Sequence, residues 1–448
     1  MLRFLIASIA ARAARAALKL MRRQASYLPG KIALTICPDF MARCARPEVV
    51  IAVTGTNGKT TTSNLIADCL ERLGKKVLGN RYGSNIAAGI CSTLIDGTTF
   101  TGKLRDDYDA AVFEVDERSS RLVYPYVEPD YLLVTNIFRD SMYRNAHAEY
   151  ISNFISSAVP AKTVLILNAD DLIASSIAPG SRRVYFGVGG HYRTVRNTVC
   201  DIRLCPECGA PLRFTELRYN HIGRAECTAC RFRSPACSYT GVMEDGGLTV
   251  GVNKYPLIGA NLQNMYNELS AITVLSELGF EPRAIAEAIS NVGIIKSRFD
   301  ELETESGKKL HCIMAKGLNP VAVSGVFDLV RSTPGRKAVL MMLDDVYDEK
   351  DSSENIAWIY DTDFEFLAHD DILTVAAAGP RHLDYRLRML IAGIDPHRVV
   401  TDASPAQLAR LMDLQGCDSV FLLFELYRKQ EADAVRDVLF ERLKATEV

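Results

Sequence analysis

The residues best suited to chemistry form one loop, Val53-Thr54-Gly55-Thr56-Asn57-Gly58-Lys59-Thr60-Thr61. Its glycines let backbone N–H groups turn toward a phosphate, and a helix that begins behind them adds partial positive charge. Lys59 would reach the β- and γ-phosphates of ATP, and the Thr60 hydroxyl would bind Mg²⁺. The common GxxxxGK pattern starts with glycine where this loop has Val53, so the loop is a variant. The alternative is a glycine-rich turn that happens to contain a lysine.

Four of the twelve cysteines have the spacing of metal ligands. They form two CxxC pairs that are 18 residues apart: Cys205, Cys208, Cys227 and Cys230. Because each pair offers two thiolates, the spacing predicts a closed, structural Zn²⁺ site. An iron–sulfur cluster and redox dithiols are the alternatives, and Cys200 and Cys237 are substitute ligands. We expect the remaining cysteines to be small buried apolar residues.

These groups need elements that hold them in place. Residues 49–54 are a β-branched run typical of a buried parallel strand, and residues 59–73 carry apolar side chains at helical spacing. The pattern predicts further strands at 110–115, 131–135 and 163–167, and helices at 264–278 and 284–291. Such alternation indicates a doubly wound α/β domain with a mostly parallel sheet. We interpret the cysteine-rich stretch 199–239 as an insertion in it.

The alternation of strands and helices restarts after Arg298. Strands are predicted at 310–314, 338–343, 372–376, 398–401 and 419–423, with helices at 325–330, 385–391 and 405–414. This length is sufficient for a separate core. We therefore expect a basic helix and lead-in segment at 1–48, a central ATP-binding domain at 49–297, and a C-terminal Rossmann-like α/β domain at 298–448.

The composition excludes several classes of protein. Apolar residues make up 48% of the 448 residues and charged residues 24%, which argues against a disordered chain. Lys and Arg total 52 against 54 Asp and Glu, so the whole chain gives no case for a polyanion partner. Arginines around the cysteine pairs favour a nucleic-acid-binding module, but no aromatic stripe for stacking bases accompanies them. We expect no nucleic-acid partner.

The first 38 residues contain basic and apolar side chains but no acidic ones. An amphipathic helix packed on its own domain and the same helix in contact with an anionic membrane surface are both open. A secretory signal is disfavoured, because arginines from Arg12 onward leave only a short apolar stretch. ATP chemistry favours a cytoplasmic location, with the inner face of the cell membrane as a site of contact.

Downstream of the loop, the sequence resembles the Mur ligase family, which joins amines to carboxylates at the expense of ATP. The motifs follow in the family's order: Glu114-Val-Asp116-Glu117, Thr135-Asn136-Ile137-Phe138-Arg139-Asp140, Asn168-Ala-Asp170-Asp171, Asn264-Met-Tyr-Asn267 and Arg298. The resemblance implies that Glu114 binds Mg²⁺; a solvated acidic strand end is the alternative. It also implies that Asn168 and Asp171 belong to the nucleotide site. Asn264 and Asn267 would read the adenine edge, and Arg298 would face the nucleotide.

Within that family, the cysteine insertion and the C-terminal domain resemble the MurT family of lipid II isoglutaminyl synthase subunits. Residues 26–34 resemble its lead-in segment, and Phe138-Arg139-Asp140 is characteristic of it. The resemblance implies ATP-dependent amidation of the D-glutamate α-carboxylate of the lipid II stem peptide. The product is D-isoglutamine, formed through an acyl phosphate. Ammonia would come from a GatD-like class I glutamine amidotransferase subunit in a heterodimer.

In the MurT family an aspartate of the C-terminal domain completes the partner's Cys–His–Asp triad. Asp351 is the candidate here, with Asp348 as its substitute and an acidic surface loop as the alternative. Departures from the family's segments at Tyr143 and Lys316 leave the acceptor carboxylate open. A self-sufficient Mur-type ligase that adds an amino acid to a cell-wall or polyglutamate carboxylate is the second candidate function. A zinc-ribbon binding module with a vestigial nucleotide site is the third.

Overall fold

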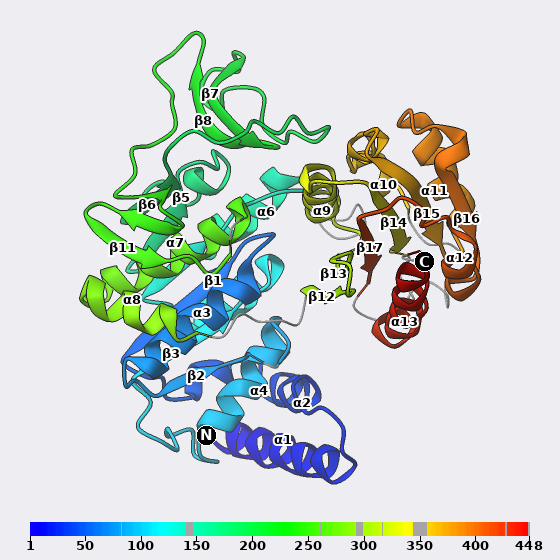
Figure 1. Ribbon diagram of the computed structural model, residues 1–448. Helices are drawn as coiled ribbons and strands as arrows, with labels where there is room; N and C mark the ends of the chain where they lie inside the picture. Colours follow the sequence, from blue (N-terminus) through cyan, green and yellow to red (C-terminus); the bar gives the residue numbers. More distant parts are fainter. Residues whose placement is uncertain are drawn as a thin grey trace. The chain divides into compact units, whose positions relative to one another are not determined.

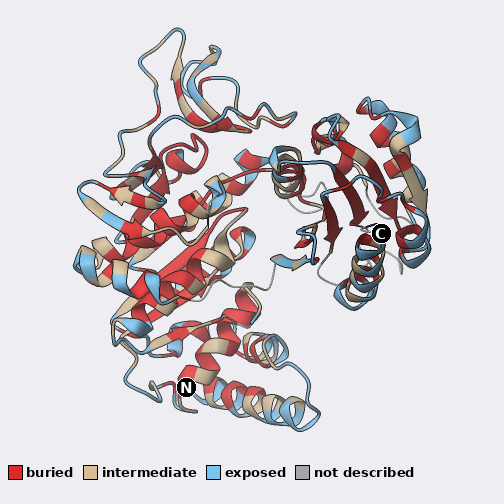
Figure 2. Ribbon diagram, viewed as in Figure 1, coloured by how far each residue is buried: buried red, intermediate tan, exposed pale blue. Residues whose placement is uncertain are grey.

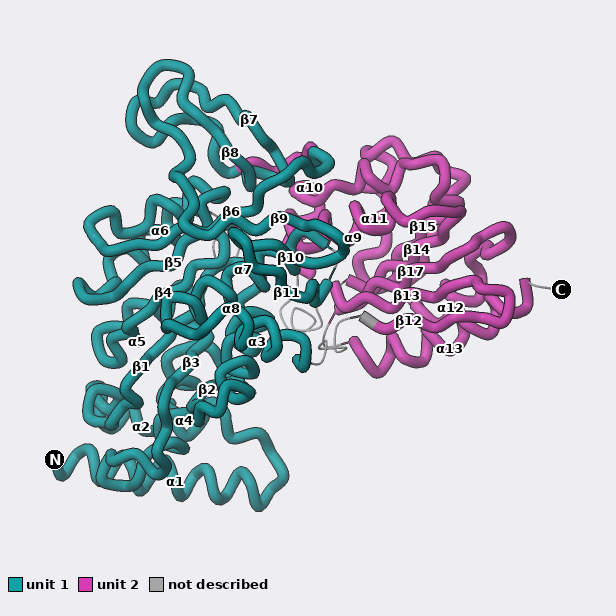
Figure 3. Tube along the Cα trace, turned by 60° about the vertical axis from the view of Figure 1, so that its left-hand side comes forward, with its two compact units in different colours: residues 1–138, 147–195, 201–293 teal, residues 139–146, 196–200, 294–448 magenta. Residues whose placement is uncertain are grey.

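The computed structural model describes residues 1–81, 83–139, 147–259, 261–292, 299–315, 317–343, 356–425 and 428–446. The chain divides into two compact units (Figure 3). Unit 1 consists of residues 1–138, 147–195 and 201–293, and unit 2 consists of residues 139–146, 196–200 and 294–448. The basic N-terminal segment is therefore part of the unit that carries the phosphate loop.

Unit 1 is built on a nine-stranded sheet with the order β11-β10-β9-β6-β5-β4-β1-β3-β2. Its strands are β1(Val49–Thr54), β2(Val77–Gly79), β3(Ala110–Glu114), β4(Tyr131–Val134), β5(Val164–Asn168), β6(Arg183–Val188), β9(Tyr239–Glu244), β10(Gly247–Val250) and β11(Asn253–Pro256). All neighbours from β2 across to β9 pair in parallel, whereas β9, β10 and β11 are antiparallel at one edge. Parallel strands need crossover connections, so helices cover both faces.

One face of this sheet is covered by α3(Lys59–Arg72), α7(Leu262–Glu277) and α8(Pro282–Ser290), which also contact one another (Figure 1). The other face shares a core with α1(Leu2–Leu20), α2(Leu28–Ile36), α4(Ala87–Gly97), α5(Ser120–Val127) and α6(Ala148–Ser156). Because side chains alternate along a strand, Val50 and Ala52 join that core while Ile51 and Val53 point to the opposite face. Both sets are buried, as Figure 2 shows for the central strands.

The predicted doubly wound sheet is confirmed. Strand 49–54 is β1, and the helix predicted at 59–73 is α3. The other five predicted strands and helices of this half correspond to β3, β4, β5, α7 and α8 within a few residues. Sequence reasoning missed β2, β6, the antiparallel edge and helices α4 to α6. Helix α4 shows the reason: it is buried on nearly every side, so its sequence has no polar face to mark a helical period.

The cysteine-rich insertion folds as a separate two-stranded antiparallel sheet, β7(Leu212–Tyr219) and β8(Ile222–Cys227). Leu212 pairs with Cys227 at one end of the hairpin, and Tyr219 pairs with Ile222 at the other. Asn220 turns the chain with a φ of 48°, in the left-handed region that asparagine tolerates better than most residues. The hairpin therefore joins two distinct places, the cysteines at one end and the turn at the other.

Unit 2 contains a six-stranded sheet with the order β12-β13-β17-β14-β15-β16. Its strands are β12(Phe299–Glu303), β13(Lys309–Met314), β14(Lys337–Met342), β15(Ile372–Ala378), β16(Val399–Asp402) and β17(Ser419–Phe424), and only β12 is antiparallel to its neighbour. Its helices are α9(Pro320–Ser332), α10(Trp358–Asp361), α11(His382–Ile391), α12(Pro405–Leu411) and α13(Lys429–Ala445). A separate apolar core confirms the predicted C-terminal α/β sheet.

The N-terminal helix α1 packs on its own unit through one face. Phe4, Ala7 and Ala11 are buried, and the Phe4 ring stacks on Phe40 with centroids 4.6 Å apart. Of the alternatives that the sequence left open, packing is confirmed for this face. In the part of the chain that the structure describes, no helix has both the length and the apolar character to cross a membrane.

Candidate functional site

The phosphate loop lies at the carboxyl end of β1, where the strand order reverses. β3 lies on one side of β1 and β4 on the other, so the connection from β3 to β4 crosses over β1. Ligands of open α/β sheets bind at such a reversal, outside the carboxyl ends of the strands. The sequence motif of the loop and the strand order of the sheet therefore indicate the same ligand-binding site.

Two positions of the loop require glycine. Gly55 has a φ of 123° and Gly58 a φ of 85°, both in the region that L side chains rarely adopt. A Cβ atom on Gly55 would lie 2.4 Å from Thr135 Oγ1, and one on Gly58 would lie 2.2 Å from Asn267 Oδ1. The loop thus has neighbours on two sides, the segment after β4 and the start of α7.

The segment after β4 holds the loop through paired hydrogen bonds. Asn136 accepts from the Asn57 N–H at 3.0 Å through its side-chain oxygen and donates from Nδ2 to the Asn57 carbonyl at 3.0 Å. Thr135 Oγ1 donates to that carbonyl at 2.7 Å. Thr56 Oγ1 accepts from the Phe138 N–H at 2.9 Å and donates to the Phe138 carbonyl at 3.2 Å. The TNIF motif, which the sequence offered only as a family resemblance, therefore supports the loop.

Lys59 is held on the loop by an ion pair that sequence reasoning missed. Its Nζ donates to Glu117 Oε1 at 3.0 Å, to the Thr56 carbonyl at 3.3 Å and to the Gly55 carbonyl. Burial lowers the pKa of Lys59, but the carboxylates of Glu117 and Glu114 outweigh it and hold that pKa above its ordinary value. The ammonium is therefore charged at neutral pH. A lysine that is expected in a buried loop needs a carboxylate to compensate its charge. That requirement could have indicated an acidic partner such as Glu117 from the sequence.

Glu114, the predicted Mg²⁺ ligand, lies at the carboxyl end of β3 beside Val53 of β1. Asn80 fixes its backbone, accepting from the Glu114 N–H at 2.9 Å and donating to the Glu114 carbonyl at 2.9 Å. Asn85 Nδ2 donates to Glu114 Oε1 at 2.9 Å, which orients the carboxylate. Carboxylate and hydroxyl oxygens are the hard ligands that Mg²⁺ prefers, so Glu114 and Thr60 suit that ion.

Asn168 and Asp171 are fully buried, and their side chains form hydrogen bonds with backbone groups of the protein. Asn168 Nδ2 donates to the Thr135 carbonyl at 3.2 Å. Asp171 accepts from the N–H of Ile137 at 2.7 Å and from that of Ile173 at 2.9 Å. Both residues were expected to bind the nucleotide; in the structure they hold the backbone that in turn holds the loop.

Asn264 and Asn267 lie on the first turns of α7, one helical turn apart, and both are partly exposed. Asn261 caps the helix by accepting from the Asn264 N–H at 2.7 Å. Asn267 lies against Gly58. Of the expected base-reading pair, Asn267 therefore lies directly at the loop.

Several predicted site residues lie outside the described residues. They are Arg298, Asp348 and Asp351, together with the family departures at Tyr143 and Lys316. Their roles stay predictions.

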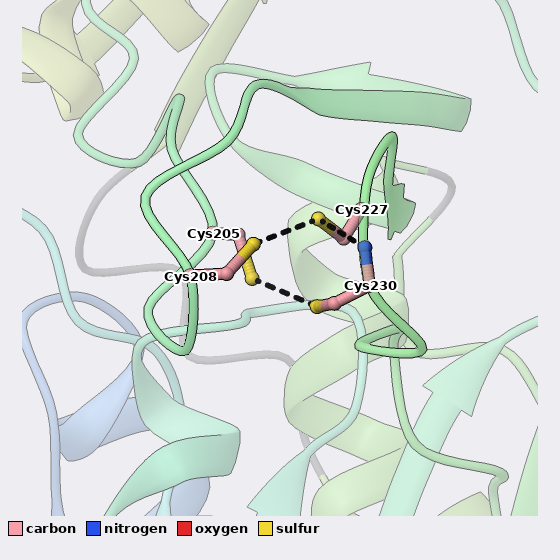
Figure 4. Close-up of side chains that lie close together, drawn as sticks. All are labelled: Cys205, Cys208, Cys227 and Cys230. Atoms are coloured by element: carbon pink, nitrogen blue, oxygen red, sulfur yellow. Dashed lines mark hydrogen bonds between the residues drawn. The ribbon is translucent and has the colours of Figure 1, made fainter.

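The four predicted metal ligands come together. One ligand atom from each of Cys205, Cys208, Cys227 and Cys230 lies within 4.8 Å of the others (Figure 4). The Ala229 and Cys230 N–H groups donate to Cys227 Sγ at 3.3 Å, and the bond from Ala229 is the main cause that lowers the pKa of the Cys227 thiol to about 6. Cys200 and Cys237 are not among the clustered cysteines. Four convergent sulfurs with N–H donors behind them suit a tetrahedral metal ion.

The other end of the cysteine hairpin is buried against the nucleotide domain. His221, at the turn, is fully buried, with its ring centroid 4.5 Å from that of Phe138 and Nε2 3.4 Å from Asp171 Oδ1. The Gly223 N–H donates to the Asp170 carbonyl at 2.8 Å. The turn therefore contacts the segment that supports the phosphate loop, which no sequence pattern predicted.

Two family models match this chain. Residues 53–203 match the Mur ligase middle domain, and residues 317–425 match the MurT ligase C-terminal model. The first match covers the phosphate loop, Glu114 and Asp171. The second covers most of unit 2.

Relatives match over nearly the whole length. The chain is 32% identical over 415 residues to the lipid II isoglutaminyl synthase (glutamine-hydrolyzing) subunit MurT of Staphylococcus aureus (strain COL), covering 91% of this chain and 92% of that protein. Identity to the MurT subunit of Streptococcus pneumoniae (strain ATCC BAA-255 / R6) is 29% over 419 residues, covering 89% of each. A pseudomurein peptide ligase type C from Methanothermus fervidus shares the fold with a TM-score of 0.67 at 19% identity, covering 90% of this chain and 81% of that one. The chain belongs to the MurT family of Mur ligases.

Proposed function

We propose that this chain is the ATP-dependent ligase subunit of a glutamine-hydrolysing enzyme that amidates lipid II. The reaction converts the D-glutamate α-carboxylate of the stem peptide to its amide and so gives D-isoglutamine. The observation that carries this proposal is membership of the MurT family over nearly the whole chain. The match of unit 2 to the MurT ligase C-terminal model favours this reaction over the addition of an amino acid by a self-sufficient ligase.

The chemistry requires ATP because a carboxylate is a poor electrophile. One carboxylate oxygen attacks the γ-phosphorus of ATP, the bond to ADP breaks, and an acyl phosphate forms. Ammonia then attacks the acyl carbon, inorganic phosphate leaves with the former carboxylate oxygen, and the nitrogen loses a proton to give the amide. Both steps depend on positioning and on compensation of charge at the phosphoryl group.

The described residues support this mechanism, and each group of residues would have its own role in it. Residues 55–61 would surround the phosphates with backbone N–H groups, and the charged Lys59 would lie on the transferred phosphoryl group. Thr60 and Glu114 would hold Mg²⁺, which compensates charge on the phosphate oxygens when bound. Asn267, next to Gly58, would contact the nucleotide from α7. We assign Asn168 and Asp171 to positioning of the loop, because both are buried and hydrogen-bonded to its supporting segment.

We propose Zn²⁺ as the ion of the four-cysteine cluster. Four thiolates leave no open coordination position, so its role would be structural. The cluster would close one end of the hairpin whose other end contacts Phe138 and Asp171.

We propose that a GatD-like class I glutamine amidotransferase supplies the ammonia in the cytoplasm, where ATP is available. Asp351 is the candidate for the aspartate that orients the partner's catalytic histidine, with Asp348 as its substitute. Asp351→Asn should abolish glutamine-dependent amidation and leave amidation with free ammonia intact. If both reactions survive, Asp351 is not the triad member.

The proposal is tested by co-purification with glutaminase candidates, followed by an assay on lipid II with ATP and either glutamine or ammonia. We expect amidated lipid II and one ADP per product. Lys59→Ala should abolish both the glutamine- and the ammonia-dependent reactions. Transfer of an amino acid in place of ammonia would support the self-sufficient ligase and overturn this proposal.

A further inference from the structure

Helix α1 has two apolar faces on opposite sides. The inner face, with Phe4, Ala7 and Ala11, is buried in the core of unit 1. Arg12 fixes the helix from the side by donating from Nη2 to the Thr98 carbonyl at 2.6 Å, and Arg15 forms an ion pair with Asp96. The helix is therefore held in one orientation, and its outer face cannot turn inward.

The outer face is an apolar stripe without a partner in the described part of unit 1. Its large side chains are Leu2, Ile6, Ile9 and Leu20, which are 73%, 51%, 61% and 87% exposed. Ala13 and Ala16 continue the stripe between them at spacings of three and four residues. At 1.5 Å per residue the stripe is about 27 Å long. An apolar surface of this length marks an interaction site, because folded domains rarely expose one.

The charges next to the stripe indicate its occupant. Residues 1–38 contain seven Lys and Arg and no Asp or Glu. Lys19, Arg22 and Arg23 are exposed at the C-terminal end of the stripe. A second copy of the helix would bring like charges together, whereas an anionic lipid surface offers both an apolar layer and negative headgroups.

We propose that α1 lies flat on an anionic phospholipid bilayer. The outer stripe enters the boundary between headgroups and acyl chains, and Lys19, Arg22 and Arg23 contact lipid phosphates. The inner face keeps unit 1 attached to the helix. This inference rests on α1 alone and does not depend on the proposed function.

Flotation of the full chain with vesicles tests the inference. We expect binding to vesicles of equal parts phosphatidylcholine and phosphatidylglycerol, weak binding to phosphatidylcholine alone, and release by high salt. Ile6→Asp combined with Ile9→Asp should lower the partition coefficient by at least about tenfold. Both side chains are exposed, so circular dichroism and the melting temperature should not change.

A matched control introduces the same two charges elsewhere. Leu383→Asp combined with Leu387→Asp alters exposed apolar residues of α11, which are 66% and 51% exposed, and should bind vesicles like wild type. Equal loss in both double variants, or undiminished binding of the Ile6/Ile9 variant, would overturn the inference. A wild-type dimer that the Ile6/Ile9 variant converts to a monomer would assign the stripe to a second copy and also overturn it.

Discussion

His221 offers a direct test of whether the cysteine hairpin supports nucleotide binding. Its imidazole is fully buried and lies beside Phe138 and Asp171. Substitution by alanine removes a buried ring whose volume is close to that of a leucine side chain. We therefore expect His221→Ala to lower the free energy of unfolding by about 2–4 kcal/mol.

The effect on ATP follows from the bonds behind the ring. Phe138 and Thr56 exchange two hydrogen bonds, and each is worth about 0.5–1.5 kcal/mol. If the cavity releases Phe138 enough to lose one of these hydrogen bonds, ATP binding weakens by about 1 kcal/mol, which corresponds to an about fivefold higher KM for ATP. The maximal rate should change little, because Lys59 and Glu114 stay in place.

The assay combines steady-state kinetics with thermal unfolding and metal content. Leu204→Ala is the control, since that side chain is in the same insertion but is exposed. It should leave both stability and the KM for ATP at wild-type values. A His221→Ala variant that is destabilised but has an unchanged KM for ATP would refute the coupling between hairpin and loop.

Three further predictions concern the loop, the cysteine cluster and pH. Gly58→Ala and Gly74→Ala both put alanine at a φ above 80°, which costs about 1–2 kcal/mol of stability, but only the Gly58 variant also drives a Cβ into Asn267. We therefore expect a raised KM for ATP in Gly58→Ala alone. Equal kinetics of the two variants would contradict the site geometry. Elemental analysis should find one zinc per chain, and chelation should lower the melting temperature; an iron chromophore would exclude the zinc assignment. Burial raises the pKa of Glu268 from 4.5 to about 7. Between these two pH values the folded state therefore binds a proton that the unfolded state has lost. The free energy of unfolding should fall by roughly 3 kcal/mol as the pH rises from 4.5 past 7. Glu268→Gln should remove this fall, and a wild-type melting temperature that does not decrease over that range would argue against it.

The sequence alone was sufficient for features that depend on local patterns. The phosphate loop was predicted because its glycines, Lys59 and the following helix are contiguous, and the cysteine cluster because four thiolates at fixed spacing suit one ion. The central strands were predicted because parallel strands buried on both faces read as continuous apolar runs. Helix α4 was missed for a related reason, since a helix buried all round shows no period.

Tertiary structure decided which side chains meet across distant segments. The sequence shows Glu114 and Glu117 in one acidic run, but only the fold pairs Glu117 with Lys59. The same motif that predicted nucleotide contacts for Asn168 and Asp171 could not reveal that both are buried behind the loop. A helical period identifies the apolar faces of a helix but not what each face contacts. Only the structure shows that one apolar face of α1 lies in the core and the other is exposed. Such pairings arise between residues that are far apart along the chain, and local composition and spacing do not encode them.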